Sequence, residues 1–295
     1  MISNKSDEIR NRYSDGNIVG ILPSPYDERD YKFKELVPLG AITIPREYES
    51  PNLHVFDQGK TNMCGPCSFS VLRYMQEEEQ SHPTEPFSPA FTYANRPVGE
   101  DFEGMYLRSI CKKGLEGTVP YHEFPGFYTY AKCKYEFQPR KEELLKKAAY
   151  FKISKYYKCT NREQTQSAII ATKGVMVGVP TYDSLIEPDS NGIVNYDPAK
   201  DTKDYGGHCV LLVGWKKINS KFYWILHNSW GKDYGINGRV YIPENYPWID
   251  SPYAVVDNEI EITYTDYMRK FKNKEKKKET VLGISNFFSN IFKKG

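Results

Sequence analysis

The feature that most constrains the fold is a change of residue pattern at about residue 150. Before it, apolar residues recur at helical spacing in the run from Cys64 to Gln80, and segments 104–113 and 140–151 also read as helices. After it come short runs rich in Val, Ile and Tyr that are bounded by Gly, Pro or Asn, among them GVMVGVPTY, HCVLLVGW, FYWILHNSW and GRVYIP. We therefore expect a helix-rich half followed by a sheet or barrel.

Length and composition suit two lobes that meet at a cleft. The chain has 295 residues, which is near the upper limit for one hydrophobic core. No apolar run approaches the roughly 18 residues that span a bilayer, and the first twenty residues lack the apolar core of a signal peptide. Six cysteines are too few for a disulfide scaffold, so free thiols in a reducing compartment are expected. No Cys/His spacing is typical of zinc, and we expect neither metal nor cofactor.

The two ends of the chain differ from its middle. Residues 1–47 form a polar lead-in with Pro23 and Pro25, which predicts an extended arm over a surface. Residues 269–295 hold nine Lys/Arg and two Glu, which gives this segment a charge of +7. Because the whole chain has a net charge of +2, the rest of it carries −5. Within segment 266–295, a basic linker precedes an amphipathic, Phe-rich piece. This tail is predicted to dock on a protein, its own body included, or on an anionic membrane surface. No motif indicates nucleic-acid binding.

Three sequence blocks carry the residue types that thiol-based acyl transfer needs. These are Cys64-Gly-Pro-Cys67 at a helix start, Gly207-His208, and Asn228-Ser-Trp-Gly. A thiolate that attacks an acyl carbon needs an imidazole partner, a group that orients the imidazole, and donors for the oxyanion. The chain supplies a candidate for each.

These blocks resemble the papain-like cysteine peptidases of the C1 family. The resemblance runs from about residue 20 to 265 and is most specific in GHCVLLVGW at 207–215 and WILHNSWG at 224–231. The lead-in ILPSPYDERDY at 21–31 and the segment FSPAFTY at 87–93 look like the bacterial and phage branch. The resemblance implies an α+β, two-lobed fold, with a helical lobe at about 58–150 and an antiparallel, barrel-like β lobe at about 151–265. Residues 1–47 would then be a short propeptide or a surface arm, and the protein cytoplasmic or virion-associated.

The nucleophile can be sought at either cysteine of the first block. His208 lies 144 residues after Cys64 and 141 after Cys67, and both separations fit a papain-type enzyme. Alignment with the family's Cys-Gly-Ser-Cys would select Cys67. In the family, however, the oxyanion Gln stands six residues before the nucleophile, and a helix-opening Ser follows it by about twenty-four. Gln58 and Ser88 satisfy both spacings with Cys64 and without a gap. We therefore favour Cys64 and keep Cys67 as the alternative.

The resemblance also implies a role for each site residue. Cys64 would be a thiolate next to His208 at a helix N-terminus, and His208 would protonate the leaving amine and later activate water. Asn228 would orient the imidazole, Trp230 would shield that hydrogen bond from solvent, and Gln58 with the Cys64 N–H would bind the oxyanion. The predicted activity is that of a cysteine endopeptidase, a thiol hydrolase that forms a thioester acyl-enzyme.

The substrate is expected to be an extended polypeptide paired through its main chain. Gly104 matches the position at which the family keeps a glycine so that substrate can approach closely. The other candidate substrate-binding residues are Met105, Tyr106, Val179, Pro180, Gly207 and Cys209. They predict an apolar or aromatic preference.

The chain also departs from the family, and other functions stay open. The Trp that usually follows the nucleophile is replaced by Gly65, or by Ser68 in the other register, and no Cys at 101–105 can form the family's common disulfide. One alternative is a papain-like scaffold with a binding or assembly role. Another is a thiol-disulfide oxidoreductase, because CGPC is also a thioredoxin-type motif.

Overall fold

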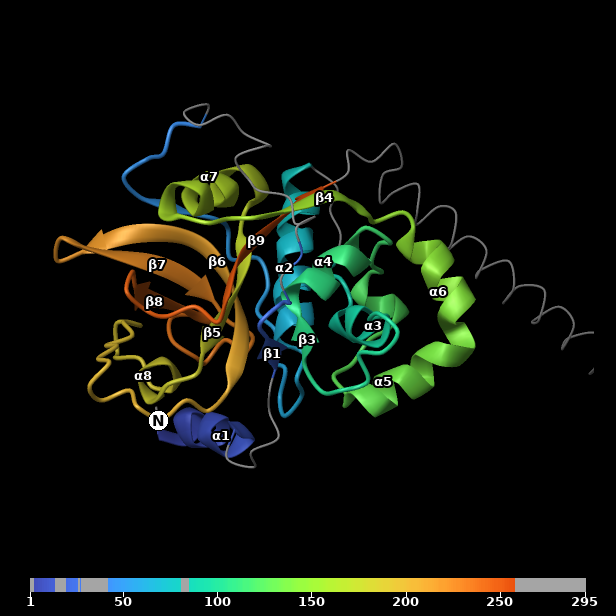
Figure 1. Ribbon diagram of the computed structural model, residues 1–295, viewed down its shortest axis with the longest axis horizontal. Helices are drawn as coiled ribbons and strands as arrows, with labels where there is room; N and C mark the ends of the chain where they lie inside the picture. The colour runs from blue at the N-terminus through green and yellow to red at the C-terminus, as the bar shows by residue number, and fades with distance from the viewer. Residues whose placement is uncertain (1–2, 14–19, 26, 28–41, 81–84, 258–295) are drawn as a thin grey trace, which may run out of the picture.

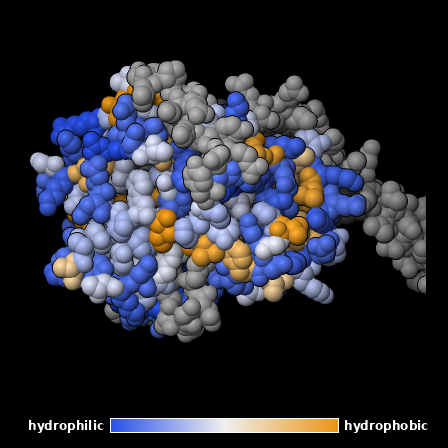
Figure 2. Space-filling view, viewed as in Figure 1, coloured by the Kyte–Doolittle hydropathy of each residue, from blue (hydrophilic) through white to orange (hydrophobic). Residues whose placement is uncertain are grey.

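A computed structural model describes residues 3–13, 20–25, 27, 42–80 and 85–257. The predicted linker and amphipathic tail, residues 266–295, lie outside these ranges. Within them, no helix is long and apolar enough to cross a membrane. The face of the molecule in Figure 2 is mostly hydrophilic and carries small, separate hydrophobic groups.

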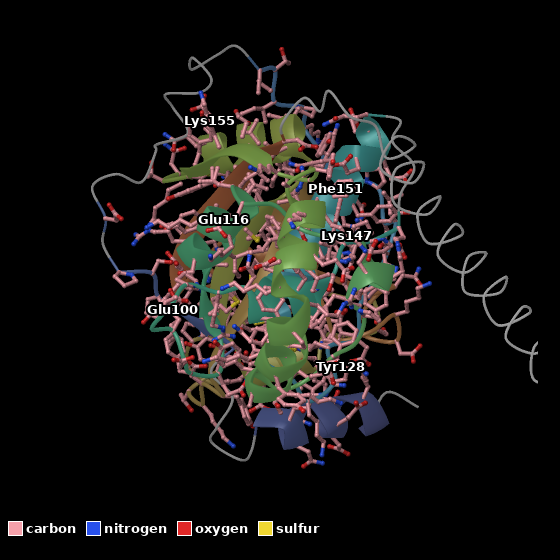
Figure 3. All side chains as sticks on the ribbon, turned by 90° about the vertical axis from the view of Figure 1, so that its right-hand side faces the viewer. Glu100, Glu116, Tyr128, Lys147, Phe151 and Lys155 are labelled. Carbon is pink, nitrogen blue, oxygen red and sulfur yellow. The ribbon has the colours of Figure 1, made fainter. Side chains whose placement is uncertain are left out.

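The first half of the chain forms a helical lobe. Its helices are α2 (Cys64–Glu79), α3 (Pro89–Ala94), α4 (Leu107–Gly114), α5 (Tyr130–Phe137) and α6 (Lys141–Ala148), with 3-10 turns η2 (Tyr121–Glu123) and η3 (Gln138–Arg140). The helices predicted near 64–80, 104–113 and 140–151 are thus present. The second begins later than expected because Met105–Tyr106 form strand β3. Figure 3 shows α5 and α6 running along the outer face of this lobe, from near the labelled Tyr128, which precedes α5, to the labelled Lys147 of α6.

The second half forms one antiparallel sheet. Its strands are β4 (Ile153–Lys158), β5 (Val175–Pro180), β6 (Gly207–Ile218), β7 (Lys221–His227), β8 (Arg239–Pro243) and β9 (Asp250–Asp257). Their order is β4-β9-β5-β6-β7-β8, and β2 (Tyr48–Glu49) also pairs with β6. The α+β class is therefore confirmed. The barrel-like expectation needs correction, since β4 and β8 do not pair with each other in the described chain and the sheet stays open.

Helix α2 lies at the junction of the two halves (Figure 1). Thirteen of its sixteen residues are buried. One buried apolar cluster joins α2 and the helical lobe to one face of the sheet, through residues such as Leu72 and Leu211. A second cluster fills the other face of the sheet beneath α7 (Arg162–Thr172) and α8 (Asp183–Ile186), and it includes Trp215 and Trp230. The start of α2 is thereby fixed against β6.

The N-terminal lead-in differs from the extended arm that was expected. Residues Ser3–Tyr13 form helix α1, which lies beside α8 on the β lobe (Figure 1). Ile9 of α1 is buried in the second cluster, and this apolar contact explains why a short polar helix is held there. Residues Ile21–Leu22 form strand β1, which pairs in parallel with β3 at the junction of the lobes.

Candidate active site

The thiol of Cys64 sits at the first position of α2. The helix begins without a side-chain cap at Met63, so the N–H groups of its first turn remain available to a negative charge. The Cys64 Sγ accepts a hydrogen bond from the backbone N–H of Cys209 at 3.3 Å. Because Cys209 directly follows His208 on β6, this contact brings the thiol to the strand that carries the imidazole.

His208, Asn228 and Trp230 form a compact, buried group. The Nε2 of His208 lies 2.7 Å from Oδ1 of Asn228, and both side chains are enclosed. The Trp230 ring stacks on the imidazole, with 4.6 Å between centroids and 20° between planes. The contact reaches across strands β6 and β7 because β6 pairs directly with β7. The structure therefore brings together these three residues, which the sequence analysis proposed as parts of one site.

Gln58 is tied to the same group through Ser229. Its Oε1 accepts the Ser229 hydroxyl at 2.5 Å, its backbone N–H donates to the Ser229 carbonyl at 2.9 Å, and its Nε2 donates to Thr61 O at 2.7 Å. The Ser229 N–H in turn donates to Asn228 Oδ1 at 2.8 Å. The amide of Gln58 is thus held on the loop that leads into α2. The sequence analysis did not identify this role of Ser229.

Cys67 has different surroundings. It lines a small space together with Phe56, Ser68, Val71, His227, Asn228 and Ser229. Both thiols are buried and free. Of these two thiols, only that of Cys64 accepts a hydrogen bond from β6, the strand of His208, among the hydrogen bonds of the described residues.

The N-terminal segment runs directly across Cys64. A Cβ added at Gly20 would lie 2.7 Å from the Cys64 Sγ, so only a glycine fits against the thiol in this arrangement. The next residue, Ile21, is buried, and its side chain lies against Gly65, Gly178 and Gly207. Strand β1 then pairs with Met105 and Tyr106.

The predicted substrate-binding residues are mostly brought together around β1. Met105 and Tyr106 pair with it, Gly104 precedes them, and Gly207 touches Ile21 while Cys209 packs near Gly65. Pro180 pairs with Gly207 across β5 and β6. Val179 belongs instead to the second buried cluster, and Gly178 is the residue of that strand that meets Ile21. Alternation along VMVGVP could have indicated Gly178, because neighbouring residues of a strand face opposite sides.

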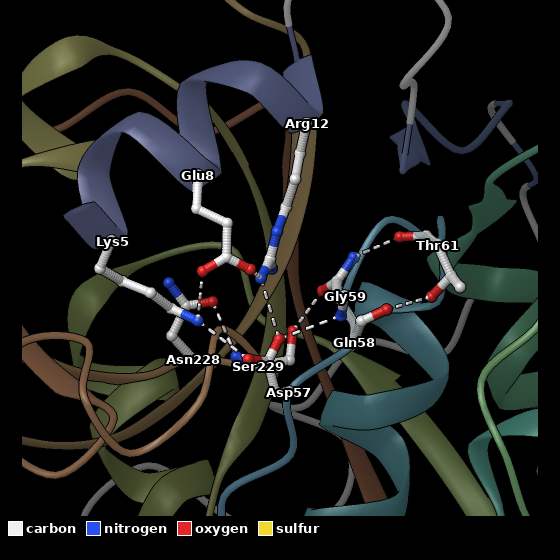
Figure 4. Close-up of polar contacts among 9 residues, drawn as sticks. All are labelled: Lys5, Glu8, Arg12, Asp57, Gln58, Gly59, Thr61, Asn228 and Ser229. Atoms are coloured by element: carbon white, nitrogen blue, oxygen red, sulfur yellow. Dashed lines mark hydrogen bonds and ion pairs between the residues drawn. The ribbon is translucent and has the colours of Figure 1, made fainter.

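Helix α1 lies beside the residues around Asp57 and Asn228, as Figure 4 shows. Lys5 Nζ lies 2.9 Å from one carboxylate oxygen of Asp57, and Arg12 Nη2 lies 3.2 Å from the other. Asp57 immediately precedes Gln58. Farther along the helix, Arg10 pairs with Asp183 at 3.0 Å and with Glu187 at 2.7 Å. Three basic residues of α1 therefore pair with three carboxylates, one on the loop that leads into α2 and two at α8.

Burial under this cover keeps the thiol and the imidazole neutral. Burial raises the pKa of Cys64 to about 11, although N–H groups of Cys209 and of the helix start lower it in part. Burial likewise lowers the pKa of His208 to about 4, although the hydrogen bond that His208 donates to Asn228 raises it in part, and the charge of Arg12 lowers it further. At neutral pH the covered site thus holds a thiol and an imidazole, and no ion pair.

Taken together, the fold and the buried thiol-imidazole site define a two-lobed thiol hydrolase. The profile described as the papain family cysteine protease matches residues 89–267. The chain therefore belongs to the papain family of cysteine proteases, and it is a thiol peptidase by class. This match begins after both Cys64 and Cys67, so it does not choose between them.

Individual relatives agree with this assignment. An uncharacterized peptidase C1-like protein of Acanthamoeba polyphaga mimivirus is 25% identical over 70% of this chain and 67% of its own length. A cathepsin B-like cysteine proteinase of Ostertagia ostertagi is 29% identical over 46% of this chain and 80% of its own length. Among solved structures, xylellain, a cysteine protease from Xylella fastidiosa, has a TM-score of 0.69 at 20% identity and covers 82% of this chain and 96% of its own.

Proposed function

We propose that the chain is a cysteine endopeptidase with Cys64 as its nucleophile, His208 as its acid and base, and Asn228 as the residue that orients the imidazole. Two hydrogen bonds carry this proposal. The Cys64 Sγ accepts one from the backbone N–H of Cys209, the residue after His208, and the His208 imidazole is hydrogen-bonded to Asn228. Thiolate attack on a peptide carbonyl would give a thioester and release the amine, which takes a proton from His208. Water activated by His208 would then hydrolyse the thioester.

The oxyanion would be bound by the Gln58 side chain and the Cys64 N–H. Gln58 is supported for this role by its two bonds to Ser229, which fix the amide beside Asn228. Donors that are fixed before reaction stabilise the developing charge without reorganising. An extended polypeptide would pair with Met105, in the place that β1 occupies.

The N-terminal segment is proposed to act as an inhibitory cover, in line with the short-propeptide interpretation of residues 1–47. Gly20 lies against the Cys64 thiol, and Ile21 lies against the three glycines named above. Together they occupy the space that a substrate chain would need. The neutral state of Cys64 and His208 supports the same conclusion, because catalysis needs a thiolate. Displacement or removal of α1 and β1 would restore both access and the ion pair.

A peptidase assay tests the proposal. Purified full-length chain is incubated with an unfolded protein and a panel of fluorogenic peptides, before and after limited proteolysis of the N-terminal segment. We expect little hydrolysis before cleavage, clear hydrolysis after it, and none with His208→Ala. Absence of hydrolysis in every condition would instead favour the scaffold alternative. Reduction of insulin without peptide cleavage would favour the oxidoreductase.

Docking of the C-terminal tail stays a prediction. Flotation with anionic lipid vesicles, comparing the full chain with a chain truncated at Lys270, tests the membrane form. Binding that is lost on truncation supports it, and absence of binding in both chains leaves docking on a protein as the prediction.

A further inference from the structure

Arg96 lies just beyond the end of α3 and reaches into the loop that leads to β3. Its Nη1 donates to the carbonyl oxygens of Gly104 at 2.8 Å and Glu100 at 3.2 Å, and also to that of Phe102. Its Nε donates to the carbonyl of Tyr93 at 3.1 Å. The side chain is only 5% exposed. A single buried cation therefore holds three carbonyls of a five-residue loop.

The guanidinium group also lies against two aromatic rings that contact each other edge to face. Its carbon lies 3.7 Å from the ring centroid of Tyr130 and 4.4 Å from that of Tyr93. A desolvated cation over an aromatic face is stabilised by the ring quadrupole. A lysine would keep the charge but has neither the planar fork nor the stacking surface. The arrangement is thus specific for arginine.

The contact with Gly104 fixes the direction of a neighbouring N–H group. The carbonyl of Gly104 and the N–H of Met105 belong to one planar, trans peptide unit, so they point in opposite directions. Arg96 binds the carbonyl, and the Met105 N–H donates to the carbonyl of Gly20 at 3.3 Å. Gly104 has φ of +85°, where glycine is conformationally free, so this peptide unit needs an external constraint.

A second contact joins this loop to the loop that precedes Cys64. One carboxylate oxygen of Glu103 accepts from the Tyr93 hydroxyl at 2.5 Å and from Asn62 Nδ2 at 3.4 Å. Asn62 stands two residues before Cys64. The Tyr93 ring that supports Arg96 is thereby linked to the start of α2.

We propose that Arg96 is a positioning residue that aims the Met105 N–H at the main chain of the substrate. By holding the Gly104 carbonyl, it keeps the donor turned toward the place where β1 now lies and where a substrate strand would pair. The proposal rests on the proposed function, because it takes the substrate to replace β1. Arg96 contacts no reacting atom, so it acts on the binding of an extended peptide and leaves the chemistry of Cys64 unchanged.

Amide hydrogen exchange in the full-length chain tests this geometry without any need for activity. With Arg96→Lys, we expect the Met105 amide to exchange about tenfold faster, the effect of losing roughly one hydrogen bond. The amides of β6, from Val210 to Val213, should exchange at the wild-type rate. Arg140→Lys is the matched control, because Arg140 also donates to a main-chain carbonyl, that of Glu123, but lies away from β3.

Kinetics of the uncovered enzyme give the second measurement. Arg96→Lys should raise the KM of an extended peptide substrate about tenfold and leave kcat within about twofold, since the lost interaction orients bound peptide in the ground state and transition state alike. Arg140→Lys should change neither constant.

Three outcomes would overturn the proposal. The first is an unchanged exchange rate at Met105 in Arg96→Lys. The second is faster exchange throughout β6 as well, which would mean that Arg96 supports the fold in general. The third is a fall in kcat with KM unchanged, which would mean that Arg96 supports the chemistry. If wild-type protein shows no peptidase activity, the proposed function fails, but the exchange measurement still decides whether Arg96 orients Met105.

Discussion

Cys64 and Cys67 stand three positions apart on one helix, yet their surroundings give them different chemistry. The Cys64 thiol accepts a hydrogen bond from the strand of His208, whereas Cys67 lines a small space beside Phe56 and His227. In the proposed mechanism, the Cys64 thiol becomes a thiolate paired with the imidazolium of His208 once the cover is displaced.

Substitution of the two cysteines is expected to have unequal effects. Cys64→Ser should lower kcat/KM on a peptide by about 10⁴-fold or more, because it removes the proposed nucleophile. Cys67→Ser, the matched control, should stay within about threefold. Steady-state hydrolysis by the uncovered enzyme measures both. Loss of activity in Cys67→Ser alone would transfer the role to Cys67.

Spacing in the sequence pointed to several candidate site residues, but not to the residues that hold them in place. Gln58 lies six residues before Cys64, and this local count favoured the cysteine whose thiol accepts a hydrogen bond from Cys209 in the structure. The Ser229 hydroxyl on Gln58 joins residues 171 positions apart, and no local pattern signals such a contact. The sequence could not indicate Arg96 for the same reason, because its hydrogen-bond partners are main-chain carbonyls, which every residue has.

At the scale of elements, helix α1 is the part of the fold that the sequence predicted least well. Its residues are mostly polar, and isolated helices of this length are marginal in water. Its position depends on Ile9 in the core and on the ion pairs of Lys5, Arg10 and Arg12. These partners lie far along the chain, so periodicity within residues 1–47 could not indicate them.

The Arg12 ion pair should control how often the cover opens. Arg12 is nearly fully buried, and Arg12→Gln removes its charge from Asp57 while keeping much of its bulk. We expect the full-length variant to react with a thiol-directed epoxide about tenfold faster than wild type, in keeping with a charge-assisted contact of about 1.5 kcal/mol. Arg162→Gln, which removes an exposed ion pair with Glu244, should react at the wild-type rate. Equal labelling rates in all three proteins would show that the Arg12 ion pair with Asp57 does not control opening.

Opening should depend only weakly on pH near neutrality. Burial raises the pKa of Cys64 to about 11 and lowers the pKa of His208 to about 4, so the covered pair binds one proton, on the thiol. The open ion pair also binds one proton, on the imidazole, so opening changes proton binding little between pH 5 and pH 7.5. We expect the rate of epoxide labelling of the full chain to change by less than about threefold over this range. A rate that falls about tenfold per pH unit toward acid, as for an isolated thiol, would contradict this prediction.

At the scale of the whole molecule, a buried ion network joins the two lobes. The Arg73 guanidinium on α2 lies 2.8 Å from Glu77 and 2.6 Å from Asp257 at the end of β9. Both Arg73 and Glu77 are fully enclosed. Burial of charges in this way is stable only while the partners are complete.

Removing one partner of this network should destabilise the whole fold. Arg73→Met leaves buried carboxylates without their cation and should lower the free energy of unfolding by about 3–5 kcal/mol. The double variant Arg73→Met with Glu77→Leu should recover part of that loss. Urea unfolding followed by circular dichroism measures both. A loss below about 1 kcal/mol in the single variant would show that the network contributes little.

The order of helix and strand patterns predicted the two-lobed class, but not the extent of the sheet. Alternating and apolar runs identify strands such as β5 and β6 because their side chains are buried on one or both faces. Whether the last strands close on the first depends on twist and on long-range pairing, and neither is encoded in a local pattern. The open order from β4 to β8 was therefore visible only in three dimensions.

The most direct test of the account is to map the residue that a thiol-directed epoxide modifies in intact protein by mass spectrometry. The account predicts one adduct, on Cys64, that forms slowly in the full-length chain, forms faster in Arg12→Gln, and is absent in His208→Ala over the same time. An adduct on Cys67, or labelling of Cys64 that ignores both substitutions, would contradict it.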